Sequence, residues 1–295
     1  MAERRTLVSV DLDDLDCYLA VHGHGKGAPS LALTRWLPRF LDLFDTLDVK
    51  ATFFVIGRDL QADVAGAGEG AAVLRRALAA GHELASHGYA HAYDFSRWSA
   101  EAVSDDLRRV DALLRDLGAE PTGFRAPGYT QSAVMLQAVA SLGYRYDSSV
   151  LPSLPYYAAK VAVMGAMALR GRRSASLLSG AGSFHGPMRP WRRTDVPLVE
   201  LPMAVSPWLR LPLIGTTLLG GPELLRRRLV SAARALPDFH LELHAIDLGD
   251  AQTDEVAAPL PELSVPFAIR QARLQSLLRE RGPTTLLRDA AASVA

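Results

Sequence analysis

Short apolar runs alternate with stretches of helical periodicity along most of this chain, and this alternation limits the fold more than any other feature. The first run, Leu7–Asp13, is apolar and ends in carboxylates, which is typical of a buried parallel strand. Further strands are expected over residues 51–57, over the run leading into His87, and over residues 122–125, 144–150, 198–206 and 239–247. Parallel strands need right-handed crossovers, so the pattern predicts a barrel or a doubly wound sheet.

Helical stripes separate these expected strands. Residues 36–47 carry apolar side chains at helical spacing, and Pro38 is compatible with that helix only in its first turn. Ser99 is a suitable N-cap for the next long helix. The remaining helices are expected over residues 71–80, 99–117, 132–142, 222–236 and 267–281.

Carboxylates and histidines follow the ends of the expected strands. The cluster Asp11–Asp14 closes the first strand, and His87 and His91 follow the third. Functional groups at the carboxyl ends of the strands are characteristic of a (β/α) barrel, so we favour the barrel over the doubly wound sheet. A single barrel of this length is common, and we expect one domain over residues 1–295.

The regular alternation breaks between residues 152 and 193. This insertion contains the apolar stretch Val161–Leu169, then a basic cluster and a loop rich in Gly, Ser and Pro. The apolar stretch is shorter than the roughly 20 residues that span a bilayer. We expect a buried core helix here, with a lid or a contact with a membrane surface as the alternative. A second apolar stretch covers Trp208–Leu219.

The composition argues against some partners. Lys plus Arg equals Asp plus Glu at 32 each, so no long-range field attracts nucleic acid. Cys17 is the single cysteine, which excludes an internal disulfide and fits a reducing compartment. The first residues are charged and then strand-like, without the features of a secretory signal. We therefore expect a cytoplasmic protein.

The stretch HELASHGYAH places His87 and His91 four residues apart. Two imidazoles at this spacing can converge on one metal ion, which also needs a third donor. The nearest candidate in character is the acidic cluster Asp11–Asp14. The other close histidine pair, His22 and His24, lies in a Gly-containing loop, where solvation or contact with substrate is expected rather than metal binding.

Four stretches, SVDLDD, GHELASHGYAH, FRAPGY and ELHAID, resemble in their order the polysaccharide deacetylase superfamily, also called carbohydrate esterase family four or the chitooligosaccharide deacetylase homology domain. The resemblance covers most of Leu7–Asp247 and leaves out the insertion. It implies a distorted (β/α) barrel with seven or eight parallel strands and an irregular insertion after the fifth. It also implies a divalent metal, usually zinc, held by one Asp and two His.

The acidic motif departs from the commonest form of that family, in which two aspartates are adjacent, so Asp11, Asp13 and Asp14 compete for two roles. Side chains alternate along a strand, so Asp11 and Asp13 project to the same side, and we assign these two. Similarity to family members with a D-x-D form implies that Asp11 is the base and Asp13 a metal ligand. Asp14 is expected to be a turn or cap residue, although it stays the alternative ligand.

The resemblance also implies roles for residues outside the metal site. Arg125 is suited to hold Asp11, because its planar fork can grip a carboxylate at two points. The backbone N–H of Tyr129 would stabilise the oxyanion, and His244 would act as general acid. Asp147 is expected to orient His244 or to bind substrate.

Together these features predict a metal-dependent hydrolase that removes an N-acyl group, acetyl or formyl, from an amino sugar. The expected substrate is a carbohydrate, either a glycan or a lipid-linked precursor. The apolar stretches favour the lipid-linked form and with it a peripheral membrane contact. The alternatives are an amidohydrolase acting on a small non-sugar amide or cyclic ureide, and a barrel that binds carbohydrate without cleaving it.

Overall fold

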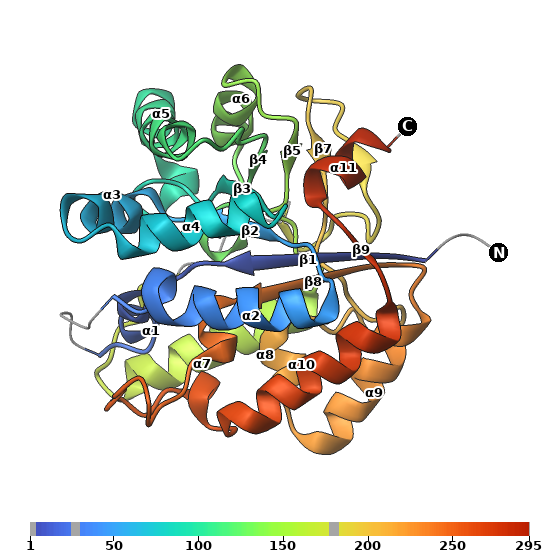
Figure 1. Ribbon diagram of the computed structural model, residues 1–295. Helices are drawn as coiled ribbons and strands as arrows, with labels where there is room; N and C mark the ends of the chain where they lie inside the picture. Colours follow the sequence, from blue (N-terminus) through green and yellow to red (C-terminus); the bar gives the residue numbers. More distant parts are fainter. Residues whose placement is uncertain (1–3, 25–29, 177–182, 295) are drawn as a thin grey trace.

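The computed structural model describes residues 4–24, 30–176 and 183–294, and its strands form one curled, mostly parallel sheet (Figure 1). The nine-stranded sheet has the order β6-β7-β5-β4-β3-β2-β1-β8, with β9 paired to β1. Only the β6–β7 pairing is antiparallel among the described strands. The strands are β1 (Arg5–Asp11), β2 (Thr52–Val55), β3 (Glu83–Ser86), β4 (Gly123–Phe124), β5 (Tyr146–Asp147), β6 (Trp191–Arg192), β7 (Val199–Glu200), β8 (Asp238–His244) and β9 (Thr284–Thr285).

Helices surround this sheet, as a distorted (β/α) barrel requires (Figure 1). Their order along the chain follows the strand–helix alternation, and the sheet curls into half a barrel. The expected fold class is therefore confirmed. The helices are α1 (Leu15–Val21), α2 (Leu37–Leu47), α3 (Gly57–Ala65), α4 (Glu69–Ala79), α5 (Ala100–Asp116), α6 (Ala133–Ser141), α7 (Leu154–Leu169), α8 (Gly215–Leu219), α9 (Glu223–Ala235), α10 (Phe267–Arg281) and α11 (Leu287–Ala292).

The two faces of the central strands differ in chemistry. In β1, Val8 and Val10 pack into the main hydrophobic core beneath the outer helices. Because side chains alternate along a strand, Ser9 and Asp11 point to the opposite, inner face. Strand β8 repeats this arrangement with apolar residues outward and His240, Glu242 and His244 inward. The inner face of the half-barrel is therefore polar towards the carboxyl ends of these strands.

The opposite end of the half-barrel is closed by the C-terminal helix. Leu287 and Ala290 of α11 pack with Leu7, Phe54 and Tyr146 in a separate apolar cluster. All of these residues are nearly or completely buried. Helix α11 thus covers this part of the sheet with apolar side chains.

Local sequence signals placed several elements correctly. Helix α10 has the predicted bounds, and Pro38 lies in the first turn of α2. The Ser99 hydroxyl accepts a hydrogen bond of 3.2 Å from the Ala102 backbone N–H, which confirms it as the cap of α5. Helices α1, α3, α8 and α11 were not predicted, because each is short and lies between stronger signals.

The insertion follows β5 as expected, but the prediction of a buried core helix within it is wrong. Helix α7 contains the whole stretch Val161–Leu169, and only Tyr157 and Met167 of its 16 residues are buried. Leu169 is 91% exposed, and Trp208 in the second apolar stretch is 94% exposed. Apolar composition alone does not distinguish a helix inside the core from one lying on the surface. Residues 177–182 of the insertion lie outside the described part of the chain.

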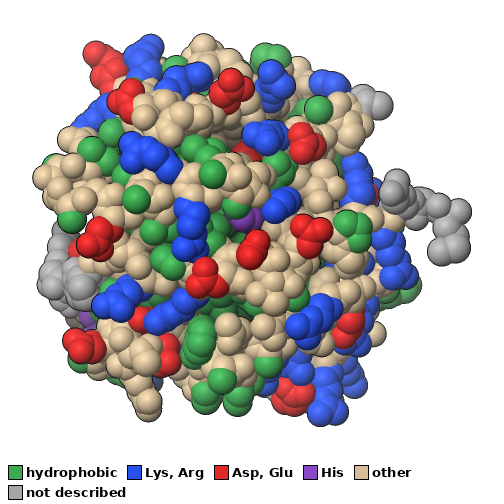
Figure 2. Space-filling model, viewed as in Figure 1, with side chains coloured by type: hydrophobic (Ala, Val, Ile, Leu, Met, Phe, Trp, Pro, Cys, Tyr) green, Lys and Arg blue, Asp and Glu red, His purple; other side chains and the backbone are tan. Residues whose placement is uncertain are grey.

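Charge on the visible face is mixed, with Lys and Arg side chains interspersed among Asp and Glu (Figure 2). Within the described residues, no helix has the combined length and apolar character that crossing a membrane requires. The organisation as a single domain stays a prediction.

The Asp14 carboxylate links the start of α1 to the chain at residues 31–32, and removing this side chain should destabilise the fold. Its carboxylate accepts hydrogen bonds from the backbone N–H groups of Leu15 and Leu31, both at 2.8 Å, and from Ala32 at 3.2 Å. Asp14→Ala should lower the free energy of unfolding by about 1–3 kcal/mol in urea titrations. The exposed control Asp45→Ala should stay within about 0.5 kcal/mol of the wild type. Equal stability of both variants would contradict this account of the cap.

Candidate active site

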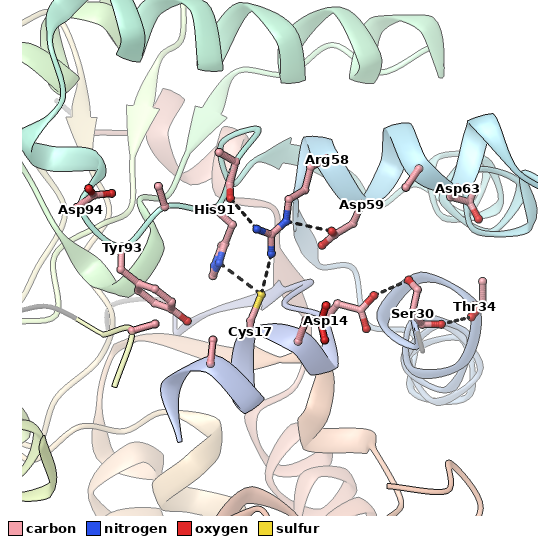
Figure 3. A pocket seen from close by; sticks show the side chains of 16 residues that line it. Asp14, Cys17, Ser30, Thr34, Arg58, Asp59, Asp63, His91, Tyr93 and Asp94 are labelled. Atoms are coloured by element: carbon pink, nitrogen blue, oxygen red, sulfur yellow. Dashed lines mark hydrogen bonds and ion pairs between the residues drawn. The ribbon is translucent and has the colours of Figure 1, made fainter. Parts of the chain in front are cut away.

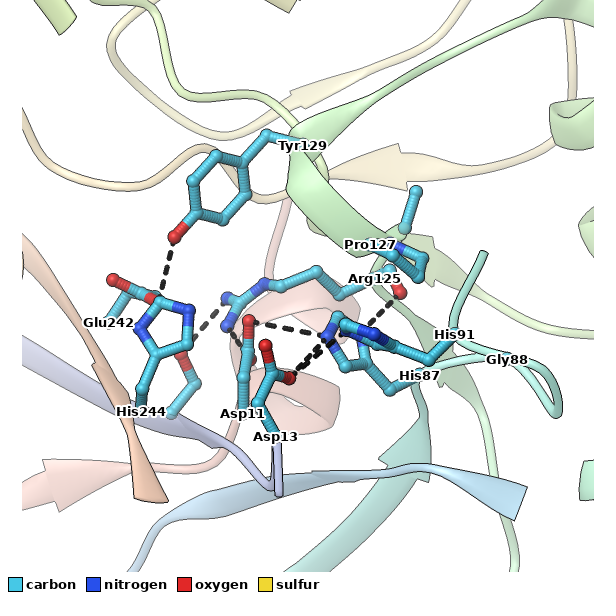
Figure 4. Close-up of polar contacts among 12 residues, drawn as sticks. Asp11, Asp13, His87, Gly88, His91, Arg125, Pro127, Tyr129, Glu242 and His244 are labelled. Carbon is cyan, nitrogen blue, oxygen red and sulfur yellow. Dashed lines mark hydrogen bonds and ion pairs between the residues drawn. The ribbon is translucent and has the colours of Figure 1, made fainter. Parts of the chain in front are cut away.

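Three buried side chains meet at the open end of the half-barrel. Oδ1 of Asp13 lies 3.2 Å from Nε2 of His87 and 3.2 Å from Nε2 of His91. One donor atom from each residue lies within 4.8 Å of the other two (Figure 4). The structure thus brings together the three residues that the sequence analysis assigned to a metal.

The donor set fits a divalent metal. Two ligand atoms at about 2.0–2.1 Å from a tetrahedral zinc lie about 3.3–3.4 Å apart, close to the distances found here. Asp13 Oδ1 and His91 Nε2 are also buried without a hydrogen-bond partner in the described structure. Buried polar atoms without partners are costly, and a cation bound between them would remove that cost.

The backbone around these ligands explains how a short sequence motif builds the site. Strand β1 ends at Asp11, so Asp13 lies in the turn before α1, and Asp14 points away to cap that helix. Gly88 and His91 both have positive φ, +76° and +50°, in the loop after β3. This tight path turns His91 back towards His87, and their ring centroids lie 4.9 Å apart. A positive φ at His91 is a strained conformation held by the surrounding structure.

The Nδ1 atoms of His87 and His91, which do not face the proposed metal, have partners that orient the two rings. Nδ1 of His87 donates to the Arg125 carbonyl at 2.8 Å, which leaves Nε2 free to bind a metal. Nδ1 of His91 lies 3.5 Å from Cys17 Sγ, and this thiol is also 3.5 Å from Nη2 of Arg58 (Figure 3). Cys17, Arg58 and His91 also line a cavity of about 740 Å³. Cys17 is buried, as expected for a small side chain.

Asp11 is held by a fully buried arginine. Nη1 of Arg125 lies 2.5 Å from Asp11 Oδ1, while Nη2 donates to the hydroxyls of Ser9 and Ser148, each at 2.9 Å. The expected two-point grip on the carboxylate is therefore wrong in detail, because the second nitrogen is used by serines. Asp11 Oδ2 remains free of Arg125 and lies 3.7 Å from His87 Nε2, beside the three metal ligands.

His244 lies on the other side of Asp11 and is paired with a residue that the sequence analysis missed. Nδ1 of His244 lies 2.9 Å from Oε1 of Glu242, two residues earlier on β8 (Figure 4). Burial opposes protonation, yet the Glu242 carboxylate raises the pKa of His244 well above its usual value. Spacing could have revealed Glu242, since two residues apart on a strand means the same face.

Tyr129 contributes differently from the expectation. Its backbone N–H already donates to the Ala126 carbonyl at 3.1 Å, within a tight turn where Gly128 and Tyr129 both have positive φ. The expected oxyanion contact from this N–H therefore stays a prediction, and it requires the N–H to leave or share this hydrogen bond. The Tyr129 hydroxyl instead donates to Glu242 Oε1 at 3.0 Å and so helps to fix the partner of His244.

Asp147 is part of a separate buried cluster, and the expectation that it orients His244 is corrected. Its carboxylate accepts from Gln131 Nε2 and Ser149 Oγ, both at 2.7 Å, and Gln131 also donates to Glu200 at 3.0 Å. Burial raises the pKa of Asp147. Glu242 occupies the position beside His244 that Asp147 was expected to fill.

A cavity of about 310 Å³ opens over these groups. Its lining includes Asp11, Asp13 and His244 together with residues of α7. His22 at its rim pairs with Glu262 at 2.9 Å, and His24 lies 3.0 Å from Nη2 of Arg172, so neither histidine joins the ligand set. A base, a general acid and a metal site around one cavity are suited to hydrolysis of an unactivated acyl bond.

Comparisons with known proteins agree with this arrangement. Residues 24–146 match the family model for polysaccharide deacetylase. The peptidoglycan deacetylase of Helicobacter pylori is 29% identical over 157 residues, covering 50% of this chain and 50% of that protein. The chitin deacetylase of Colletotrichum lindemuthianum is 34% identical over 120 residues, covering 40% and 47%. The chain therefore spans half the length or less of these curated relatives.

The fold is also shared with solved structures. A protein of Mycobacterium smegmatis assigned to the polysaccharide deacetylases superposes with a TM-score of 0.58 at 18% identity, covering 99% of this chain and 90% of that one. The structure of a chitin deacetylase from Colletotrichum lindemuthianum gives 0.52 at 14% identity, covering 99% and 89%. At these identities the likeness establishes the shared fold.

Loss of either imidazole should abolish metal retention. His87→Ala or His91→Ala removes one of three ligands, so we expect a loss of zinc affinity beyond the 10–100-fold typical of an outer-shell partner. The matched control is His22→Ala, which removes an imidazole at the cavity rim. Metal analysis after dialysis, combined with a competitive chelator titration, measures the effect. Full metal occupancy in either ligand variant would refute the site.

Glu242→Gln should move the alkaline limit of turnover to lower pH. Glu242 raises the pKa of His244, so the imidazolium persists above the usual range, and removing the carboxylate charge lowers that pKa. The upper pH limit of kcat should fall by at least about one unit, corresponding to about 1.4 kcal/mol. The exposed control Glu120→Gln should keep the wild-type profile. An unshifted limit in Glu242→Gln would remove Glu242 from this role.

Proposed function

We propose that this chain belongs to the polysaccharide deacetylase superfamily and is a metal-dependent hydrolase that removes an acetyl or formyl group from the nitrogen of an amino sugar. The convergence of Asp13, His87 and His91 next to the Arg125-held Asp11 is the observation that carries this proposal. It fits an amide-cleaving reaction because an amide carbonyl is a poor electrophile and neutral water is a poor nucleophile.

The metal proposed for the site is zinc. One carboxylate and two imidazoles form a common zinc ligand set that leaves a coordination position open. Bound there, zinc would act as a Lewis acid and lower the pKa of a coordinated water towards about 7. The remaining steps belong to side chains of the protein.

Asp11 is proposed as the general base. Arg125 fixes Oδ1, and Oδ2 faces the space beside His87 and Asp13, where an attacking water would be held. Oδ2 would accept the proton of that water as its oxygen bonds to the acyl carbon. Arg125 then keeps the protonated carboxyl in position through its remaining contact.

His244 is proposed as the general acid. Glu242 engages Nδ1, so the proton on Nε2 is available to the cavity. When the carbon–nitrogen bond breaks, this proton would pass to the leaving nitrogen, giving a free amine and a carboxylate product. The raised pKa of His244 supports this assignment, because a general acid has to be protonated before the bond breaks.

The substrate proposed is a carbohydrate, either a glycan or an amino sugar on a lipid carrier. The apolar residues of α7 along the cavity support the lipid-linked form, and a peripheral membrane contact of the exposed part of α7 would accompany it.

Release of acetate or formate from N-acetyl and N-formyl amino sugars tests the reaction directly. Asp11→Asn should lower kcat by about 10²–10⁴-fold, because an amide cannot accept the proton, while about one equivalent of metal is retained. The exposed control Asp105→Asn, on α5, should behave as wild type. Thermal unfolding verifies that Asp11→Asn folds. Undiminished kcat in that variant, or no carboxylate release by the zinc-loaded wild type from any of these sugars, would overturn the proposal.

A further inference from the structure

Helix α7 forms a wall of the catalytic cavity with an unusual distribution of charge. Its sequence, LPYYAAKVAVMGAMAL, contains Lys160 as the single charged residue among 16. Lys160 lines the cavity together with the ligand Asp13 and the proposed acid His244. The helix therefore brings one cation to the site on an otherwise uncharged wall.

The ammonium of Lys160 has no carboxylate partner among the described residues. The side chain is half-buried, and a Cβ placed on Gly128 would lie 3.8 Å from its Nζ. Burial lowers the pKa of Lys160 to about 8, so the group is still largely charged at pH 7. Removing a charge from water without a partner costs free energy, and an anion from outside would offset that cost.

The acidic groups of the cavity are already engaged elsewhere. Asp11 is paired with Arg125, and Glu262 with His22. Glu242, which does not line the cavity itself, is paired with the lining residue His244. Asp13 faces the two metal-binding histidines. An anion that neutralises Lys160 therefore has to arrive with the substrate.

The surroundings of Lys160 indicate what accompanies that anion. The cavity wall next to it is apolar, and its side chains come from α7 and from two segments facing the helix. These residues are Tyr156, Ala159, Val163, Met164, Met167, Val21 and Ile214. Val163 is 54% exposed and Leu169, at the end of the same helix, 91%, so the apolar surface continues out of the cavity. A neutral, hydrated polysaccharide would leave this surface without an apolar contact.

We propose that Lys160 binds a phosphate group of the substrate and that the apolar wall of α7 receives a hydrocarbon chain attached to it. The substrate class is then an amino sugar carried on a lipid phosphate. This inference rests on the proposed function, because it assigns the carrier of the sugar that is deacylated. Sugar phosphates without a lipid share the anion, and the apolar wall favours the lipid-bearing source.

Binding of alkyl phosphates to the metal-free protein tests the inference without depending on turnover. Inorganic phosphate, butyl, hexyl and octyl phosphate, and neutral octyl glucoside are titrated by calorimetry below their micelle concentrations. We expect affinity to rise about two- to fourfold per added methylene, and octyl phosphate to bind more tightly than octyl glucoside.

Substitutions of Lys160 distinguish the contribution of its charge to binding from that of the apolar residues of α7. Lys160→Met keeps an apolar stem but should lower the affinity for octyl phosphate at least about tenfold. The affinity of Lys160→Arg for octyl phosphate should stay within about threefold of the wild type. Lys50→Met is the matched control, because Lys50 precedes β2 at the opposite end of the sheet, and it should bind as wild type. Unchanged affinity in Lys160→Met, or no binding of any alkyl phosphate, would overturn the proposal.

Two further readouts distinguish the outcomes. Inorganic phosphate that binds as tightly as octyl phosphate would overturn the lipid assignment and leave only an anion site. With the zinc-loaded enzyme, Lys160→Met should raise KM about tenfold for a polyprenyl-phosphate N-acyl sugar and leave KM for neutral N-acetylated oligosaccharides unchanged. An equal rise for both substrates would contradict the phosphate contact. Failure of all turnover, with alkyl phosphate binding intact, would count against the proposed reaction alone.

Discussion

The buried guanidinium of Arg125 is the interaction on which the rest of the site depends. It contacts Asp11 and Ser9 on β1, the Ser148 hydroxyl and carbonyl after β5, and the ring of Phe54 on β2 at 4.2 Å. Its own carbonyl accepts from His87. A fully buried cation is costly unless its donors are paired, and here four hydrogen bonds join the guanidinium to groups on β1 and to Ser148 after β5. The same residue therefore positions the proposed base and orients a proposed metal ligand.

The half-barrel can hold this polar network because one of its ends is apolar and the other is polar. Helix α11 closes one end with apolar side chains, and the polar inner residues of β1 and β8 gather at the other. The register pairs Asp11 directly with His244, so the proposed base and acid are neighbours across the sheet. Low polarity around the network strengthens each charge interaction within it. Residues of α7 then line the cavity over these groups, and in the ribbon the helix lies beside α8 (Figure 1).

Much of the fold was predictable because its signals are local. The alternation of strands and helices, the cap at Ser99 and the period-two pattern of β8 each depend on neighbours in the sequence. The ligand set was predictable for the same reason, since the spacing of His87 and His91 already restricts where the rings can meet. The short helices α1, α3, α8 and α11 were missed, because their stability comes from packing that local propensity does not record.

By itself the sequence determined which chemical groups are available and on which strand face each lies. Only the tertiary structure decided their partners. Glu242 instead of Asp147 meets His244, the Tyr129 N–H is used within its own turn, and α7 lies exposed beside the cavity instead of inside the core. The physical reason is the separation of the interacting residues along the chain. Side-chain direction follows from local backbone geometry, whereas pairing between distant residues depends on how the crossovers bring strands and helices together.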